Sequence, residues 1–254
     1  MTMRNTLVYV HYEPLANMFL TAGISASDVL NSAPTPFRHL LLLPPVDEDE
    51  FIDPHTGFNE VSGEEAVKTF MRSKAARTRS WLDYRHANYL RELLPTEIAE
   101  LLYLGFTKTH ITPPYYYKLQ NQLVFLPMPN DMVTMYFRTT KRFSQTLATA
   151  IVRHLRLAAN DQPFWLRLRA QHFPAVSTTV LADLFPLFEE GVLLDFSRGL
   201  FSRDQVKIPL YQVQNRFVPE QPLDQDGLKR VGELSLIRET NQWQLRLREK
   251  VAER

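Results

Sequence analysis

Apolar side chains recur at every fourth position between residues 143 and 155, where Phe143, Leu147, Ile151 and Leu155 follow one another. Residues four positions apart lie on the same side of an α-helix, so this spacing predicts a helix with one buried face. We expect the helix to end near Ala158, before a polar run begins.

The segment from residue 62 to residue 104 carries further helix signals. Ser62 followed by Glu65 matches a capping box, in which the serine hydroxyl accepts a bond from a backbone amide and the glutamate reaches back. This pattern predicts a helix from residue 63, in which Glu64 and Lys68 are spaced for an ion pair. Two more helices are expected, over 82–94 and 95–104.

The N-terminal part of the chain contains two short apolar runs, at 7–12 and 40–43. They are rich in branched and aromatic residues and do not alternate with polar ones, which favours strands that are covered on both faces. Between them, the segment 14–21 has a proline near its start and Gly23 after its end, so we expect a short helix there.

Strands are expected again after the middle of the chain. Two apolar runs flank Pro127-Met128-Pro129-Asn130-Asp131, a sequence typical of a turn, so we predict a β-hairpin over about 122–138. Residues Trp243 to Arg248 alternate strictly between apolar and polar, as in a strand with one buried face. The strands predicted beyond residue 160 are at 165–170, 192–197, 206–214, 233–239 and 242–249, together with one helix from Ser177.

These elements indicate an α+β protein. Its middle is expected to be helical over about 62–104 and 140–158, with N-terminal strands, the hairpin near 122–138 and a mostly antiparallel C-terminal β region. The change of pattern near residue 160 suggests a mixed domain over 1–160 and a β-rich region over 161–254, unless the two form one continuous domain.

Composition narrows the chemistry. The chain of 254 residues has no cysteine, which excludes disulfides, thiolate zinc sites, iron–sulfur clusters and a cysteine nucleophile. Its 8 glycines are never clustered, so no phosphate-binding loop, dinucleotide fingerprint or nucleophile elbow is present. The first residues lack the features of an export signal, and no apolar run is long enough to span a bilayer, so a cytoplasmic protein without membrane contact is expected.

The charges are unevenly distributed, although the formal net charge is only +1. Residues 47–65 contain aspartates and glutamates but no lysine or arginine, whereas residues 66–91 contain seven cations and only Asp83 as an acid. Such a basic segment predicts contact with an acidic protein surface or a nucleic acid, unless the preceding acids neutralise it. The candidate anion-binding residues of this segment are Lys68, Arg72, Lys74, Arg77, Arg79 and Arg85.

Two other groups of residues are candidates for chemistry. Arg142, at the start of the helix predicted over 140–158, is suited to a phosphate or carboxylate, and His154 on the same helix to a role as proton carrier. The alternative is a solvated cationic face with an ordinary histidine. In the acidic segment, hard oxygen ligands and one imidazole for Mg²⁺ or Mn²⁺ are available from Asp47, Asp49, Asp53 and His55.

The function favoured by these patterns is a binding or regulatory protein that contacts an anionic partner through the arginine-rich segment. The alternative is an enzyme that acts on a phosphorylated or carboxylated small molecule, with or without a metal. The sequence names neither the ligand nor a cofactor, and it leaves open whether the protein is catalytic and whether it forms a homo-oligomer.

Overall fold

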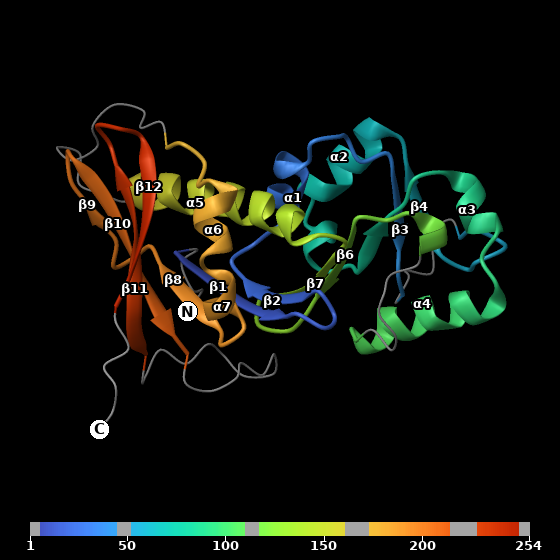
Figure 1. The fold of residues 1–254 in the computed structure, drawn as a ribbon. Helices are drawn as coiled ribbons and strands as arrows, with labels where there is room; N and C mark the ends of the chain where they lie inside the picture. The colour runs from blue at the N-terminus through green and yellow to red at the C-terminus, as the bar shows by residue number, and fades with distance from the viewer. Residues whose placement is uncertain (1–5, 45–51, 110–116, 161–172, 214–227, 249–254) are drawn as a thin grey trace, which may run out of the picture.

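The computed structural model describes residues 6–44, 52–109, 117–160, 173–213 and 228–248. Its strands form one 12-stranded sheet, in which every pairing among the described residues is antiparallel. The order across the sheet is β12-β11-β10-β8-β1-β2-β7-β6-β5-β3-β4, and β9 pairs with β10. Figure 1 shows the C-terminal strands at one end of an elongated molecule and helices α3 and α4 at the other.

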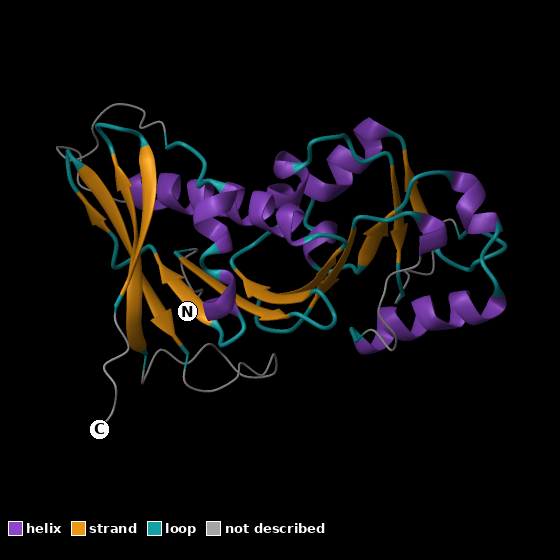
Figure 2. Ribbon diagram, in the orientation of Figure 1, coloured by secondary structure: helices purple, strands orange, loops and turns teal. Residues whose placement is uncertain are grey.

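The strands are β1 (Leu7–Glu13), β2 (Met18–Ala22), β3 (His39–Leu42), β4 (Asn59–Ser62), β5 (Trp81–Asp83), β6 (Leu123–Pro127), β7 (Met132–Phe137), β8 (Val192–Asp195), β9 (Leu200–Phe201), β10 (Gln205–Gln212), β11 (Lys229–Ile237) and β12 (Gln242–Leu247). The α-helices are α1 (Ala26–Ser32), α2 (Glu64–Arg72), α3 (Ala87–Arg91), α4 (Pro95–Thr107), α5 (Thr140–Asn160), α6 (Thr178–Ala182) and α7 (Phe185–Phe188). Two 3-10 helices are η1 (Ala75–Arg77) and η2 (Tyr117–Leu119). Figure 2 shows how the helices lie around this sheet.

The sheet is apolar on both faces because successive residues of a strand point to opposite sides. Leu40 and Leu42 of β3 belong to the core under α1, α2 and α5, whereas Leu41 belongs to a second core that α3 and α4 cover. In β1, Val8 and Val10 join the first core, while Tyr9 lies in a third cluster on the other face. The predicted strands with two covered faces are therefore confirmed.

Helix α5 packs along the first core. Phe143, Leu147, Ile151 and Leu155 are all fully buried, which confirms the face predicted from their spacing. Phe143 also stacks on Phe19 of β2 with 3.6 Å between ring centroids, so this contact joins the helix to the centre of the sheet.

The α+β class, the hairpin and the antiparallel C-terminal β region are confirmed. The predicted C-terminal strands correspond to β8, β10, β11 and β12, except that the strand predicted over 165–170 lies outside the described residues. The division near residue 160 stays a prediction, although the sheet runs across it because β1 pairs with β8.

Three local predictions were wrong. The helix expected over 82–94 is instead strand β5 followed by the short helix α3, because Trp81 and Leu82 are buried in cores on opposite faces of the sheet. The helix expected over 14–21 is a turn followed by β2, which pairs with β1 along its whole length. Helix α2 does begin within one residue of its predicted start, but Ser62 belongs to β4 and Gly63 is the N-cap without a side-chain bond.

Within the described ranges, no helix has both the length and the apolar character that a membrane span requires.

Candidate anion-binding site

A hollow of about 460 Å³ lies where the loop after α1, the end of β5 and the first turn of α5 meet. The loop turns away from α1 at Pro34 and Pro36, since proline cannot continue a helix, and it then enters β3. The lining residues are Pro34, Thr35, Pro36, Phe37, Arg38, Asp83, Tyr84, Arg85, Gln120, Gln122 and Arg142. We call this hollow the Arg142 pocket.

Arg142 is held in place at one wall of the pocket. Its Nη1 donates to the carbonyl oxygen of Ser32 at 3.0 Å and to Oε1 of Gln145 at 3.1 Å. Burial lowers the pKa of Arg142, and the nearby Asp83 carboxylate partly offsets this effect. The guanidinium nevertheless stays charged, because an arginine pKa starts far above neutrality. Its Nε and Nη2 groups have no bonding partner in the described part of the chain, so they are available to a ligand.

Asp83 is the carboxylate of the Arg142 pocket, and it is 8% exposed. Its Oδ1 accepts bonds from the backbone amides of Gln122 at 2.9 Å and Leu123 at 2.7 Å. Burial nevertheless raises the pKa of Asp83 to about 6, because the loss of hydration outweighs these bonds and the attraction to Arg142. Asp83 and Arg142 line the same hollow, but they do not form an ion pair with each other.

Two more arginines line the pocket from separate segments, and both are exposed. Arg85 follows β5 and donates from Nη1 to Oε1 of Gln120 at 2.9 Å. Arg38 precedes β3, and its charge helps lower the pKa of Glu64, although Lys68 contributes more. The pocket therefore combines three guanidinium groups with one carboxylate, a composition suited to carboxylate or phosphate ligands.

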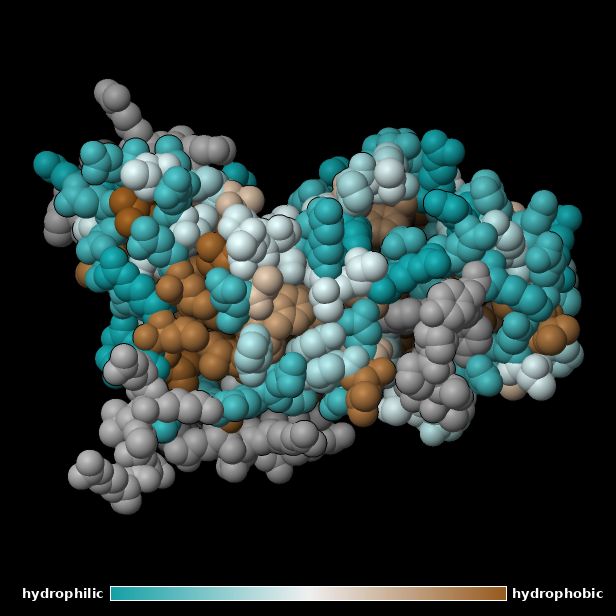
Figure 3. All heavy atoms as spheres, in the orientation of Figure 1, coloured by the Kyte–Doolittle hydropathy of each residue, from teal (hydrophilic) through white to brown (hydrophobic). Residues whose placement is uncertain are grey.

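The remaining candidate cations of the segment 66–91 fall into two groups, those already engaged within the protein and those that are exposed. Lys68 forms the predicted ion pair with Glu64 at 2.7 Å and another with Glu65 at 2.9 Å, so the preceding acids do neutralise this residue. Arg79 is half-buried and already interacts with another residue. By contrast, three cations are exposed, and no ion pair to them is found among the described residues. They are Arg72 at the end of α2, Lys74 just before η1 and Arg77 in η1. Figure 3 shows that the surface around α2 is predominantly hydrophilic.

His154 does not lie near the Arg142 pocket. It lies twelve positions after Arg142 on α5, which corresponds to about 18 Å along the helix axis. His154 is fully buried, its ring stacks on Phe196, and its Nε2 lies 2.7 Å from the carbonyl oxygen of Gly23. Nε2 also lies 3.2 Å from Nη2 of Arg153, so this nitrogen is engaged within the protein in either tautomer.

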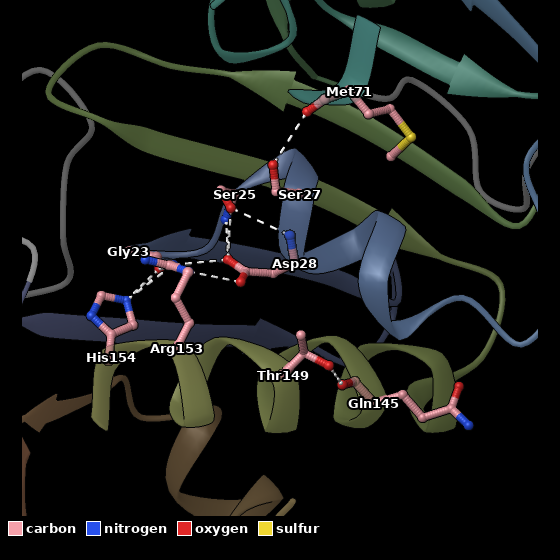
Figure 4. Close-up of polar contacts among 9 residues, drawn as sticks. All are labelled: Gly23, Ser25, Ser27, Asp28, Met71, Gln145, Thr149, Arg153 and His154. Carbon is pink, nitrogen blue, oxygen red and sulfur yellow. Dashed lines mark hydrogen bonds and ion pairs between the residues drawn. The ribbon is translucent and has the colours of Figure 1, made fainter. Parts of the chain in front are cut away.

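Next to His154, Arg153 joins α5 to the start of α1 (Figure 4). Its Nε donates to Oδ1 of Asp28 and its Nη2 to Oδ2, both at 2.8 Å, and Nη2 also lies 2.7 Å from the Gly23 carbonyl oxygen. Asp28 in turn caps α1, because its Oδ2 accepts from the backbone amide and the hydroxyl of Ser25 at 2.8 Å each. This cluster stabilises the fold and leaves little of its donor capacity for a ligand.

Of the four proposed metal ligands, the structure describes Asp53 and His55. Asp47 and Asp49 lie outside the described residues. The Oδ1 atom of Asp53 accepts from the backbone amides of His55 at 3.1 Å and Thr56 at 2.8 Å, and Nε2 of His55 lies 3.3 Å from the Leu93 carbonyl oxygen. No group of three or more acidic or histidine side chains arranged to hold a metal ion is found in the described ranges.

A second hollow, of about 300 Å³, lies on the C-terminal strands and is also lined by cations. Here the positive charges are already compensated. Glu233 lies 3.0 Å from Arg230 and 3.5 Å from Lys207, and Arg198 lies 3.4 Å from Asp195. The Arg142 pocket is therefore the stronger candidate for an external anion.

The structure brings together Arg85 and Arg142 from the predicted set and adds Arg38 and Asp83, which sequence reasoning missed. Arg38 has no lysine or arginine close to it in sequence, so no local pattern pointed to it. Asp83 did carry a signal, since it is the single acid among the cations of residues 66–91. Comparisons of the chain with protein-family models, curated proteins and solved structures found no match.

Proposed function

We propose that the protein binds a small molecule that carries a carboxylate or phosphate group in the Arg142 pocket. The observation that carries this proposal is the convergence of Arg38, Arg85 and Arg142, from three separate segments, on one hollow with a single opposing carboxylate. It favours a small anionic ligand over a purely structural role for these arginines.

The physical argument rests on the state of Arg142. Its planar guanidinium is half-buried and already oriented by two hydrogen bonds, so little side-chain entropy is lost when an anion binds to the remaining N–H groups. Each hydrogen bond to a charged group contributes about 1.5 to 3 kcal/mol. The exposed Arg38 and Arg85 add a more screened attraction, which brings the anion to the pocket.

Binding is the part of the function that the pocket supports, and catalysis on the bound molecule is the alternative. The pocket offers one group suited to proton transfer near neutral pH, the Asp83 carboxyl, whose pKa is raised to about 6. The predicted proton carrier His154 supplies no support for this alternative, because its ring is buried at the other end of α5.

Isothermal titration calorimetry with inorganic phosphate and with succinate, at about 50 mM salt, tests the proposal. We expect measurable binding of at least one probe, a loss of about tenfold or more in affinity for Arg142→Gln, which removes a charged donor, and a smaller loss for Arg85→Ala, because Arg85 is exposed. Arg72→Ala is the matched control, because Arg72 is an exposed arginine that does not line the pocket.

The control variant should bind like the unmodified protein. Circular dichroism would establish that Arg142→Gln, which loses its bond to the Ser32 carbonyl, is still folded. Absence of binding to both probes, or an equal loss of affinity in the control, would contradict the proposal.

A second candidate function is contact with a large anionic partner through Arg72, Lys74 and Arg77. The specific observation is that these three side chains are exposed and that no ion pair to them is found in the described part of the chain. With a short DNA duplex as probe, replacing all three by alanine should lower the slope of log affinity against log salt by about 2 to 3. Undetectable binding of the duplex and of a poly-glutamate peptide at about 50 mM salt would exclude this candidate.

A further inference from the structure

Asp83 and Arg142 line the same hollow without forming an ion pair, although the carboxylate is buried and the guanidinium is half-buried. Each of the two is held by other groups. Arg142 is bonded to the Ser32 carbonyl and to Gln145, and Oδ1 of Asp83 accepts from two backbone amides. The two charges are therefore fixed as separate features of one pocket.

The second carboxylate oxygen of Asp83, Oδ2, is the atom of this arrangement that lacks a hydrogen-bond donor among the described residues. No hydrogen bond to Oδ2 is found in the ranges that the structure describes, although the residue is only 8% exposed. Oδ2 keeps some access to solvent, because it is not among the fully buried side-chain atoms that lack a partner, and a ligand that supplied a donor there would add a charge-assisted hydrogen bond. A ligand with an anionic group alone would instead be repelled by Asp83.

We propose that the ligand of the Arg142 pocket carries an amino group close to its acidic group, so that the acid contacts Arg142 and the ammonium contacts Oδ2 of Asp83. The ligand class is thus an amino-bearing carboxylic or phosphoric acid. This inference rests on the proposed function, because it adds a second contact to the same bound molecule. Burial raises the pKa of Asp83 to about 6, so at higher pH the carboxylate is ionised and attracts an ammonium group.

The test compares two pairs of probes that differ only in the amino group. Phosphoethanolamine is measured against ethyl phosphate, and β-alanine against propionate, by calorimetry at about pH 8, where Asp83 is ionised. In the unmodified protein, the amino-bearing member of at least one pair should bind about tenfold more tightly, as expected for one charge-assisted hydrogen bond.

Asp83→Asn should reduce this preference to less than about threefold while binding of ethyl phosphate stays equal or improves, since one repulsive charge is removed. The asparagine oxygen can still accept from the amides of Gln122 and Leu123, so the fold should be retained. Asp183→Asn, at an exposed aspartate outside the pocket, is the control and should keep the preference.

The outcomes separate the two proposals. If ethyl phosphate and phosphoethanolamine bind equally well, and β-alanine and propionate do too, the inference is overturned while the proposed function stands. If none of the four probes binds, the inference is overturned, and the proposed function fails with it when inorganic phosphate and succinate do not bind either. The comparison of paired probes on the unmodified protein decides the inference even if Asp83→Asn does not fold.

Discussion

Replacing Asp28 by alanine should destabilise the protein strongly, because this one side chain both closes the first turn of α1 and joins α1 to α5. Its carboxylate is 1% exposed and accepts from Nε and Nη2 of Arg153 on α5 at 2.8 Å. It also accepts from the backbone amide and hydroxyl of Ser25 at 2.8 Å, which closes the first turn of α1. The alanine variant loses both the ion pair and the carboxylate half of the capping box, although the backbone amide of residue 28 can still donate to the Ser25 hydroxyl.

The magnitude follows from the burial of the two partners. Removing one member of a buried ion pair costs about 3 to 5 kcal/mol, because the other charge is left without a partner. The side chain of Arg153 is 32% exposed and can recover part of its hydration, so we expect the lower end, about 3 kcal/mol. For a chain of this size, that corresponds to a fall of about 6 to 12 °C in melting temperature.

Urea unfolding followed by circular dichroism measures this loss. Asp183→Ala is the matched control, since Asp183 is exposed, and it should change the free energy of unfolding by less than about 0.5 kcal/mol. In a double-mutant cycle, Asp28→Ala and Arg153→Ala should couple by at least about 1 kcal/mol. A loss below about 1 kcal/mol for Asp28→Ala, or purely additive effects, would refute this reasoning.

Gly23→Ala should cost at least about 3 kcal/mol, because the added Cβ would lie 2.1 Å from the Leu7 carbonyl oxygen. Gly57 has a similar positive φ but open space around it, so Gly57→Ala should cost only about 1 kcal/mol. Equal urea midpoints for the two variants would contradict this difference. Burial raises the pKa of Asp83 from 3.8 to about 6, so the native state binds this proton more tightly than the unfolded chain. The contribution of Asp83 to the free energy of unfolding should therefore fall by about 2 to 2.5 kcal/mol as pH rises from about 4 to 7, and Asp83→Asn should lack this contribution in urea titrations across that range. Phe143 is fully buried and stacks on Phe19 of β2, so Phe143→Ala should lower the free energy of unfolding by about 3 to 5 kcal/mol in thermal or urea unfolding. A loss below about 2 kcal/mol would contradict the importance given to this stacking contact.

Several features were determined by the sequence alone, because they depend on neighbours along the chain. The spacing from Phe143 to Leu155 specified α5 and its buried face, since helical periodicity is a local property. The unbroken apolar run at 40–43 likewise specified a strand with two covered faces. The ion pair between Glu64 and Lys68 followed from their separation by one helical turn.

Other features were decided only when distant segments met. Trp81 and Leu82 carry signals compatible with a helix, but β5 forms because β3 and β6 pair with it on either side. Local propensity is weak compared with the burial that such pairing supplies, so the sequence prediction failed there. Contacts between distant segments also decided which of the other predicted cations are exposed, since Arg79 interacts with another residue while Arg72 is exposed.

The Arg142 pocket depends on the same long-range pairing. Arg38 precedes β3, Arg85 follows β5 and Arg142 begins α5, so these residues become neighbours only after the sheet has assembled. The sequence by itself determined that arginines are abundant in the middle of the chain and that cysteine chemistry is excluded. Only the tertiary structure decided which arginines share one hollow with Asp83, because strand pairing between distant residues leaves no mark on the local pattern of either partner.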